Sequence, residues 1–331
     1  MTSGSNNNPT LLPTVYIAGD SFNTTTQYWP YPIYWKNGKQ VHLPHPGLSS
    51  GSDIAVTDSN VYVTSSGVFQ GNNVTYWKNG IGINLADPTI IYPTATGITL
   101  SGNDVYTVGT AYVTNFQKKV PIYWKNQDNA IKIATYSFNH GEGRDIAVVG
   151  TDVYIAGTTF DFILGAGSPP CYWKNGAPTF LHAVTPSFNG VAKSIFVSGS
   201  DIHVVGECYP SSSASPFGWA VYWKNGIPTE LAPSNKISEA NCVTVVGNDV
   251  YIAGAVTGTD GQRHATYWKN GIPVILNNAT ATISSTATAI AVYENDVHVV
   301  ENRSVDSAIY WKNGQATSLG RGRAYAIIVR K

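Results

Sequence analysis

The hexapeptide IYWKNG at residues 33–38 decides the fold, because close copies of it return six times along the chain. The tryptophans of the seven copies are Trp35, Trp77, Trp124, Trp173, Trp223, Trp268 and Trp311. Successive tryptophans are 42 to 50 residues apart, and no helical pattern of apolar residues lies between them. A period of this length without helices is typical of a four-stranded sheet that is repeated as the blade of a propeller.

Each repeat contains recognisable strands. The segment GRDIAVVGTDVYIAG (143–157) has two runs of alternating, largely β-branched residues joined by a Gly-Thr-Asp turn, which predicts a hairpin. After a variable loop comes YWKNG, whose Asn-Gly pair supplies the two positive-φ residues of a tight type I′ turn. One more short strand follows that turn. Every repeat therefore predicts four antiparallel strands.

The two ends of the chain match different parts of one repeat. TVYIAGD (14–20) matches a second strand, and GRAYAIIVRK (322–331) matches a first strand. Joined in one sheet, residues 14–44 and 322–331 would complete a seventh blade and leave no open edge between the first and last repeats. We therefore predict an all-β fold, a seven-bladed β-propeller of four-stranded antiparallel blades, in one domain over residues 13–331. Residues 1–12 are expected to be a flexible polar leader.

The composition limits the classes of partner. Lys plus Arg and Asp plus Glu number 20 each, so the net charge is zero and nothing predicts binding to nucleic acid or to an anionic membrane. No stretch reaches the roughly 18 apolar residues of a membrane helix. The three cysteines suggest no disulfide framework. Cys171 is expected to be a buried thiol, and a Cys208–Cys242 bridge would require neighbouring strand ends. Low charge with many Gly, Tyr, Thr, Ser and Asn favours an exported protein.

The VYIAG…YWKNG repeats, from about Thr14 to Lys331, resemble those of a family of extracytoplasmic, often lipid-anchored proteins of Bacteroidetes-type bacteria. The resemblance implies a propeller outside the cytoplasm, at the cell surface, in the periplasm or secreted. It also implies that a Ser/Asn-rich leader such as residues 3–8 follows a lipidated cysteine, and no such cysteine is present here. The family has no agreed activity, so the resemblance does not indicate a function.

The repeated Trp-Lys-Asn motif has two interpretations. A tryptophan that occurs once per blade can fill the wedge between blades, where burial of each ring contributes roughly a few kcal/mol. Alternatively, each Trp-Lys-Asn edge is a ligand pocket, as in lectins that bind one sugar per blade. We favour the structural role for all seven tryptophans.

The long and dissimilar loops are expected to share one face of the ring, and binding sites are usually built on such loops. Trp29 and Trp219, the two tryptophans outside the repeat, fall in loops between second and third strands, and TQYWPYP (26–32) adds Tyr28 and Tyr31. Exposed aromatic rings beside Asn, Thr and Ser suit sugars. The alternative is that these rings only pack the loops onto the blades.

Charged residues cluster at the predicted mouth of the central channel. Alignment of the first strands places seven residues at one level: Ser52, Thr96, Arg144, Lys193, Asn241, Thr288 and Arg323. A second level lies just inside: Asp53, Gly97, Asp145, Ser194, Cys242, Ala289 and Ala324. The loop NHGEGRD (139–145) adds His140 and Glu142. Three cations and two carboxylates around one funnel can hold a charged or hydroxylated ligand. Solvated loop charges would give the same pattern.

The sequence contains no motif for a nucleotide, a metal or a nucleophilic active site, and its histidines form no metal-ligand pattern. We therefore predict a monomeric, non-enzymatic extracytoplasmic binding protein, without cofactor or metal, that recognises a glycan or similar polar ligand on the variable-loop face. The first alternative is a scaffold for a protein partner, which a flat apolar aromatic patch would favour. The second is a polysaccharide hydrolase or lyase with paired carboxylates from Asp53, Asp145 and Glu142.

Overall fold

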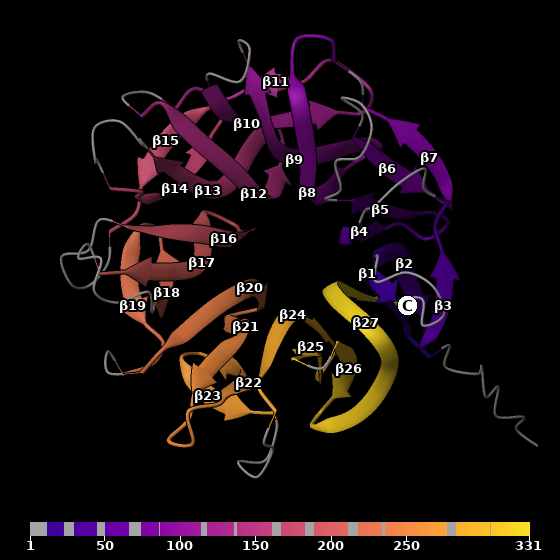
Figure 1. Ribbon diagram of the computed structural model, residues 1–331, viewed down its shortest axis with the longest axis vertical. Helices are drawn as coiled ribbons and strands as arrows, with labels where there is room; N and C mark the ends of the chain where they lie inside the picture. The colour runs from indigo at the N-terminus through magenta and orange to yellow at the C-terminus, as the bar shows by residue number, and fades with distance from the viewer. Residues whose placement is uncertain are drawn as a thin grey trace, which may run out of the picture.

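The computed structural model describes residues 12–22, 30–44, 50–65, 74–85, 87–113, 118–135, 138–160, 167–182, 189–210, 218–233, 236–276, 283–304 and 306–331. The regular structure in these residues is all β-strand, and the strands form a β-propeller of four-stranded antiparallel blades around a central opening (Figure 1). Within the same residues, no helix is long and apolar enough to cross a membrane.

Five blades are separate four-stranded sheets in which each strand pairs with the next along the chain. Their strands are β4 (Gly51–Val56), β5 (Val61–Ser65), β6 (Thr75–Lys78) and β7 (Ile81–Asn84); β8 (Ile91–Ser101), β9 (Asp104–Val113), β10 (Lys118–Lys125) and β11 (Ile131–Lys132); β12 (His140–Val149), β13 (Asp152–Phe160), β14 (Pro170–Lys174) and β15 (Ala177–Phe180); β16 (Asn189–Ser198), β17 (Asp201–Tyr209), β18 (Trp219–Lys224) and β19 (Ile227–Glu230); β20 (Ser238–Val246), β21 (Asp249–Thr257), β22 (Arg263–Lys269) and β23 (Ile272–Ile275).

The other seven described strands form one continuous antiparallel sheet. Across that sheet they are β24 (Ser285–Tyr293), β25 (Asp296–Arg303), β26 (Ser307–Lys312), β27 (Gln315–Arg330), β1 (Thr14–Phe22), β2 (Pro30–Lys36) and β3 (Lys39–His42). β27 pairs with β26 up to Arg321 and with β1 from Gly322 onward. The strand bends where it changes partner, because Gly320 and Gly322 have φ angles of 93° and 142°, which favour glycine.

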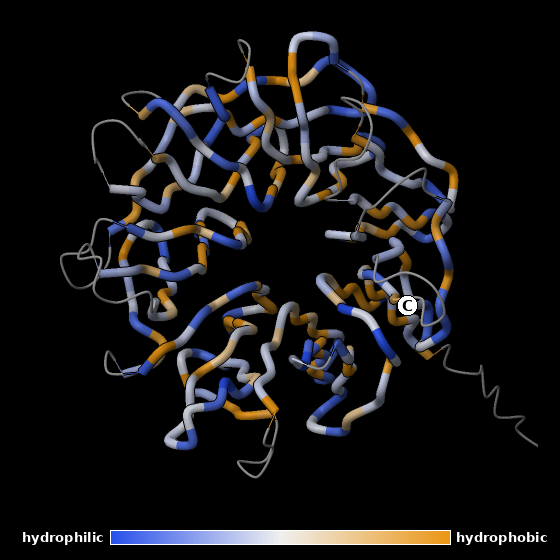
Figure 2. The backbone as a smooth tube through the Cα atoms, in the orientation of Figure 1, coloured by the Kyte–Doolittle hydropathy of each residue, from blue (hydrophilic) through white to orange (hydrophobic). Residues whose placement is uncertain are grey.

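The motif tryptophans pack between neighbouring blades, and all seven are buried. In the described residues the buried apolar side chains form seven clusters, and each cluster contains one of these tryptophans. Figure 2 shows the apolar segments inside the blades. Four indole N–H groups donate to a backbone carbonyl near the end of the preceding repeat: Trp77 to Pro44 (2.8 Å), Trp223 to His182 (2.7 Å), Trp268 to Leu231 (2.8 Å) and Trp35 to Leu319 (3.3 Å). One ring per repeat therefore joins each blade to its neighbour.

The Lys-Asn part of the motif is bonded within its own blade. Asn175 Oδ1 accepts the backbone N–H of Val153 at 2.8 Å, and its amide donates to Asp152 at 2.8 Å. Lys174 Nζ lies 2.8 Å from the same carboxylate and 5.2 Å from the ring centroid of Tyr154. The same lysine–aspartate pair recurs in four other repeats, at Lys125, Lys224, Lys269 and Lys312. These contacts favour a structural role over a ligand pocket at each edge.

The three cysteines are free thiols. Cys171 and Cys208 are buried, whereas Cys242 is partly buried. Cys208 packs in the cluster around Trp223, and Cys242 packs against the clusters around Trp35 and Trp311. A Cys208–Cys242 bridge is not formed, because the two residues belong to different interfaces between blades.

Candidate ligand site at the channel mouth

The innermost strand of each repeat has a β-bulge at the same point. The residues that the pairing register skips are Ser52, Thr96, Arg144, Lys193, Asn241, Thr288 and Tyr325. A bulge takes its extra side chain out of the regular alternation of the strand. All seven side chains line one central cavity of about 400 Å³.

Six of these seven residues are the ones that the sequence predicted for this level of the channel. The prediction for the seventh was wrong. The bulged residue of β27 is Tyr325 and not Arg323, because the bulge falls between Ala324 and Ala326 where β27 pairs with β1. This point is two residues later than the alignment of the first strands suggested. The second level is therefore occupied by Ala326 and not by Ala324.

Four of the bulged side chains bond the inner strand of one repeat to that of the next. Each donates to a backbone carbonyl of the following inner strand: Ser52 to Ala95 (3.0 Å), Thr96 to Gly143 (3.1 Å), Asn241 to Ala287 (3.1 Å) and Thr288 to Ala324 (2.7 Å). A short hydroxyl or amide side chain therefore suffices for the structural role of this position.

Arg144 and Lys193 depart from this pattern, and they occupy adjacent blades. Arg144 Nη2 lies 2.6 Å from Glu142 Oε2. Lys193 Nζ lies 3.2 Å from Glu207 Oε1 and 3.3 Å from Glu239 Oε2. Two long cationic side chains thus replace short bridging ones on the same side of the channel, and each is paired with a carboxylate.

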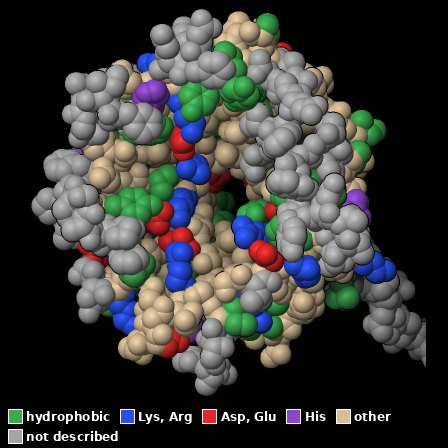
Figure 3. All heavy atoms as spheres, in the orientation of Figure 1, with side chains coloured by type: hydrophobic (Ala, Val, Ile, Leu, Met, Phe, Trp, Pro, Cys, Tyr) green, Lys and Arg blue, Asp and Glu red, His purple; other side chains and the backbone are tan. Residues whose placement is uncertain are grey.

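Further polar residues extend this arrangement. Lys119 pairs with Glu142, and Arg263 Nη2 lies 2.6 Å from Glu239 Oε1. Tyr209 donates its hydroxyl to a carboxylate oxygen of Glu207. Figure 3 shows cationic and anionic side chains alternating in an arc beside the central opening. We call the following residues the mouth cluster: Lys119, Glu142, Arg144, Lys193, Glu207, Tyr209, Glu239 and Arg263.

The surrounding cations hold two carboxylates of the mouth cluster in the ionised form. Burial by itself raises the pKa of Glu142, but Lys119 and Arg144 outweigh burial and the pKa is lowered. The pKa of Glu239 is lowered as well, because neighbouring cations outweigh its burial. A general acid must hold a proton near the working pH, so neither glutamate is suited to that role at neutral pH.

Asp53 and Asp145 line the same central cavity and link neighbouring blades. Asp53 accepts the backbone N–H groups of Ile54 and, in the next blade, Ile98, each at 2.8 Å. Asp145 makes the equivalent two bonds, at 2.7 Å within its own blade and at 2.9 Å to the next. Both oxygens of each carboxylate therefore take part in structural hydrogen bonds. Ligand binding by these two residues stays a prediction.

The contribution of Asp53 to the free energy of unfolding is expected to fall as the pH rises from about 4 to about 8. Burial and the nearby Asp145 raise the pKa of Asp53 to about 8, whereas an ordinary aspartate has a pKa of about 3.9. In this range the folded protein retains a proton that the unfolded chain has released, so rising pH favours unfolding. Asp53→Asn should weaken this dependence, which urea unfolding at about pH 5 and about pH 9 would measure.

Asp58→Asn is the matched control, because the Asp58 side chain is 94% exposed. It should keep the pH dependence of the wild type. Asp145→Asn should move the loss of stability to lower pH, because it removes a charge that raises the pKa of Asp53. If Asp53→Asn kept the full wild-type pH dependence, Asp53 would not be the group that titrates.

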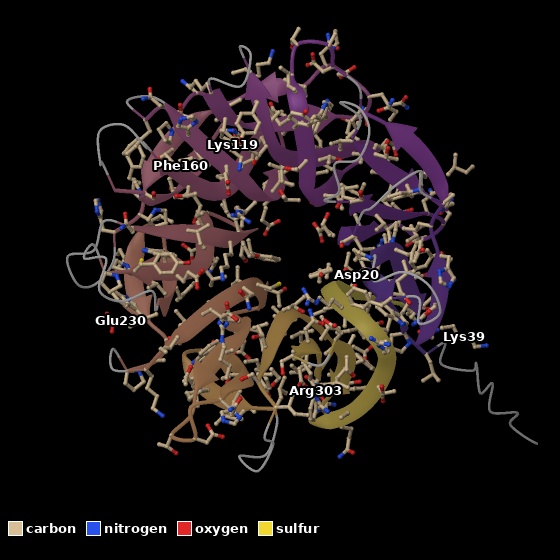
Figure 4. The ribbon with its side chains drawn as sticks, in the orientation of Figure 1. Asp20, Lys39, Lys119, Phe160, Glu230 and Arg303 are labelled. Carbon is tan, nitrogen blue, oxygen red and sulfur yellow. The ribbon has the colours of Figure 1, made fainter. Side chains whose placement is uncertain are left out.

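Arg323 is separate from the mouth cluster. Its Nη2 lies 3.0 Å from Asp306 Oδ1, and its backbone N–H donates to the buried Asp20 at 3.1 Å. Tyr325 donates its hydroxyl to the other oxygen of Asp20 at 3.1 Å. Figure 4 shows Asp20 beside the opening, and Figure 1 shows β27 across the opening from β16. The structure therefore does not bring Arg323 together with Arg144 and Lys193.

His140 was expected in a loop, but it is the first residue of β12. Its Nδ1 accepts the backbone N–H of Lys119 at 3.1 Å, and its ring stacks on Phe160 with centroids 5.4 Å apart. Figure 4 shows Lys119 and Phe160 on the same side of the ring. The polar segment NHGEGRD was expected to be a loop, whereas Gly141 and Gly143 pair within the sheet. His140 therefore packs β12 against its neighbours.

The predicted aromatic residues do not form one group in the described part of the chain. Tyr28 and Trp29 lie outside the described residues. Tyr31 is half-buried in β2, opposite Ser21 of β1. Trp219 was expected in a loop, but it begins β18 and pairs with a residue of β17. Its ring is half-buried against the core and its indole nitrogen is buried, because β18 extends the alternation of the motif by three residues. Stacking of Trp219 on a sugar stays a prediction.

Sequence reasoning missed four members of the mouth cluster: Lys119, Glu207, Glu239 and Arg263. Glu207 left a weak signal, because a carboxylate follows the VVG of its strand where three other repeats have Thr110, Thr158 or Ala255 and the first has Asp20. The pattern of the repeat contains no signal for Glu239 or Arg263. They stand beside variable loops, and the spacing of the motif says nothing about which loops meet.

No protein-family model and no curated protein matches this sequence. Solved structures match the fold. A puromycin-hydrolysing peptidase from Mycobacterium tuberculosis has a TM-score of 0.58 at 12% identity, over 94% of this chain and 53% of its own. A periplasmic gluconolactonase from Pseudomonas aeruginosa has a TM-score of 0.54 at 11% identity, over 97% of this chain and 99% of its own. An acylaminoacyl peptidase from Pyrococcus horikoshii has a TM-score of 0.55 at 9% identity, over 92% of this chain and 50% of its own.

The chain thus spans about half the length of the two peptidases and nearly all of the gluconolactonase. At identities this low, the likeness shows the propeller fold alone. Unrelated activities often share one fold, so function has to be argued from the site.

Proposed function

We propose that the protein is a non-enzymatic binding protein that recognises a glycan or similar polar ligand at the channel mouth, on the face of the variable loops. One observation carries the proposal. Where four blades use a short bulged side chain to bond the next blade, two adjacent blades present Arg144 and Lys193. Lys193 also bonds the next blade, through Glu239 and Asn241, but a short side chain suffices for that role in four repeats. A polar ligand gives a reason for a long cation at both positions.

The site has the size and the polar groups that a small hydroxylated ligand needs. Arg144, Lys193, Glu207 and Tyr209 line a cavity of about 420 Å³ at the mouth. Small-molecule sites commonly measure about 300–1,000 Å³ and use a few polar groups to orient the ligand. A location outside the cytoplasm belongs to the same proposal. It is supported by the low charge of the chain and by the resemblance of its repeats.

Binding is favoured over catalysis by the state of the carboxylates. Asp53 and Asp145 each use both oxygens for backbone hydrogen bonds. Glu142 is paired with two cations and has a lowered pKa. A glycoside hydrolase needs one carboxyl group that holds a proton and a second that faces the substrate. Asp53 can hold a proton, because its pKa is raised to about 8, but its oxygens are already bonded to the backbone. All three carboxylates expected for an enzyme are thus engaged in contacts within the protein, which favours binding.

We also infer that the ring has seven blades and that the seventh closes it. In this arrangement β24, β25, β26 and the first half of β27 form one blade, and the second half of β27 with β1, β2 and β3 forms the next. Two observations support it. β27 changes partner at Gly322, and the seven buried clusters, each with one motif tryptophan, equal the number of interfaces in a closed ring of seven.

A glycan array tests the binding proposal. Wild-type protein is expected to retain one class of glycan, and Val191→Trp should weaken that binding at least about tenfold. Val191 lines the mouth cavity in β16, and an indole there would occupy the space that the ligand needs. The variant's melting temperature would be measured alongside to confirm folding.

Val246→Trp is the matched control. Val246 is 41% exposed at the other end of an inner strand, beside a short turn, so an added indole leaves the mouth open. It should bind as the wild type does. Equal binding by folded Val191→Trp would place the ligand elsewhere, and a wild-type protein that retains no glycan would overturn the proposal.

A further inference from the structure

The structure points to a ligand that carries an oxyanion, either a carboxylate or a phosphate, which Arg144 and Lys193 bind directly. This inference rests on the proposed function, because it concerns the same mouth cavity. It adds the chemical class of the ligand, which neither the fold nor its likeness to solved structures supplies.

The guanidinium of Arg144 has more N–H donors than its bond to Glu142 uses. Its side chain is 47% exposed, and in the described part of the chain its one hydrogen-bond partner is Glu142. That bond uses Nη2, so Nε and Nη1 can turn to the cavity that Arg144 lines. Arginine presents five donors in a planar fork that matches a carboxylate or a phosphate in two parallel bonds. A neutral hydroxyl would use this fork less fully.

Lys193 is placed to complete such a site. Its Nζ lies between Glu207 and Glu239, and it donates to Asn241 Oδ1 at 3.0 Å. The side chain is 23% exposed, so its charge is partly shielded from bulk water. An ion pair in this setting is stronger than on an open surface. Lys193 lines the same cavity as Arg144, one blade further along the ring.

The charge balance of the mouth cluster leaves room for one more anion. Its cations are Lys119, Arg144, Lys193 and Arg263, and its carboxylates are Glu142, Glu207 and Glu239. Among the described side chains, this gives four positive charges against three negative ones. Tyr209 adds no charge, because burial and the Glu207 carboxylate raise the pKa of its phenol. A bound oxyanion with one negative charge would neutralise the cluster.

Two further residues of the cavity lining suit the rest of a sugar-like molecule. Ser52 and Thr96 line the cavity with short side chains whose hydroxyl oxygens face neighbours at 3.0–3.3 Å. These side chains leave space in the roughly 420 Å³ cavity. The ligand class that fits both the two cations and these two residues is therefore a hydroxylated ring with one acidic group, either a sugar acid or a sugar phosphate.

The test is an array with three sets of oligosaccharides: uronate-containing, phosphorylated and uncharged. Wild-type protein should retain an acidic set, and its affinity for the retained glycan should fall with added NaCl. Arg144→Gln and Lys193→Met should each weaken binding about 10- to 100-fold, the range expected when a hydrogen bond to a charged group is lost. Retention of the uronate or of the phosphorylated set would identify the source of the oxyanion.

Two further variants separate recognition from folding. Lys193→Arg keeps the charge beside Glu207 and Glu239 and should restore most of the binding. Lys174→Met is the matched control, because Lys174 is 47% exposed at a turn on the opposite face. It should bind as the wild type does, which would exclude a general effect of lost positive charge.

The possible failures are distinguishable. Uncharged glycans retained as well as acidic ones, with no effect of Arg144→Gln, would overturn the oxyanion inference and leave the proposed function standing. An array on which wild-type protein retains nothing would overturn both. Equal losses in Lys174→Met and Arg144→Gln would show a nonspecific charge effect and would also contradict the inference.

Discussion

Deletion of residues 322–331 is expected to abolish cooperative folding. These residues are the innermost strand beside β1 and pair with it from Thr14 to Ser21. They also bury Ala324 and Ile327 in a core cluster with Trp35. The loss would expose β1 as an edge and open two interfaces between blades, which amounts to most of a typical folding free energy of ~5–15 kcal/mol. Thermal unfolding followed by circular dichroism, with light scattering for aggregation, would measure it.

Removal of Lys331 alone is the control for this deletion. Lys331 lies beyond the last residue of β27 and is exposed, so its loss should leave the melting temperature unchanged. A protein without residues 322–331 that melts at the wild-type temperature would contradict both the role of β27 and the closed ring.

Trp173→Ala is expected to lower the free energy of unfolding by about 3–5 kcal/mol. The indole is fully buried, in a cluster with Val108 of the preceding blade and Ile155 of its own. Its ring also lies against Gly157, where an added Cβ would come within 3.0 Å of the ring. Removal of this closely packed ring is expected to leave a cavity, so the loss includes a cavity term as well as lost burial. Urea unfolding would measure it.

Ile227→Ala is the control, since Ile227 is 71% exposed on an outermost strand. It should change stability by no more than about 0.5 kcal/mol. A Trp173→Ala protein as stable as the wild type would remove the argument for a structural tryptophan and would favour the alternative of a ligand pocket at each motif.

The repeat shows which features of the fold a local sequence pattern can predict. The Asn-Gly pairs and the alternating runs predicted strands, turns and the outward order of each blade, and the described sheets follow that order. Both features depend on residues that are close in sequence. The last repeat shows the limit. Glu301 stands in β25 where five other repeats have glycine and one has Ser65, and its buried carboxylate accepts the indole N–H of Trp311 at 2.6 Å. The motif around Trp311 gives no sign of this change.

The bulges show why the candidate site was only partly predictable. Arg144 and Lys193 were expected at one level of the channel, because their strands align without ambiguity. The alignment of β27 failed, because the amino-acid sequence does not show at which residue a β-bulge interrupts the strand pairing. Tyr325 therefore stands where Arg323 was expected. The loop assignments for His140 and Trp219 failed for a related reason, because pairing with neighbouring strands extends β12 and β18 beyond the repeated pattern.

The sequence by itself determined the β-sheet blades, their turns and the tryptophan of each interface, because period, alternation and turn chemistry are properties of neighbouring residues. The tertiary structure decided the mouth cluster. Glu207 and Glu239 come from different blades and meet at the ammonium group of Lys193. Their meeting depends on how two sheets pack and on where each inner strand bulges. Both features depend on how whole blades pack against one another. The sequence of a single repeat does not encode that packing.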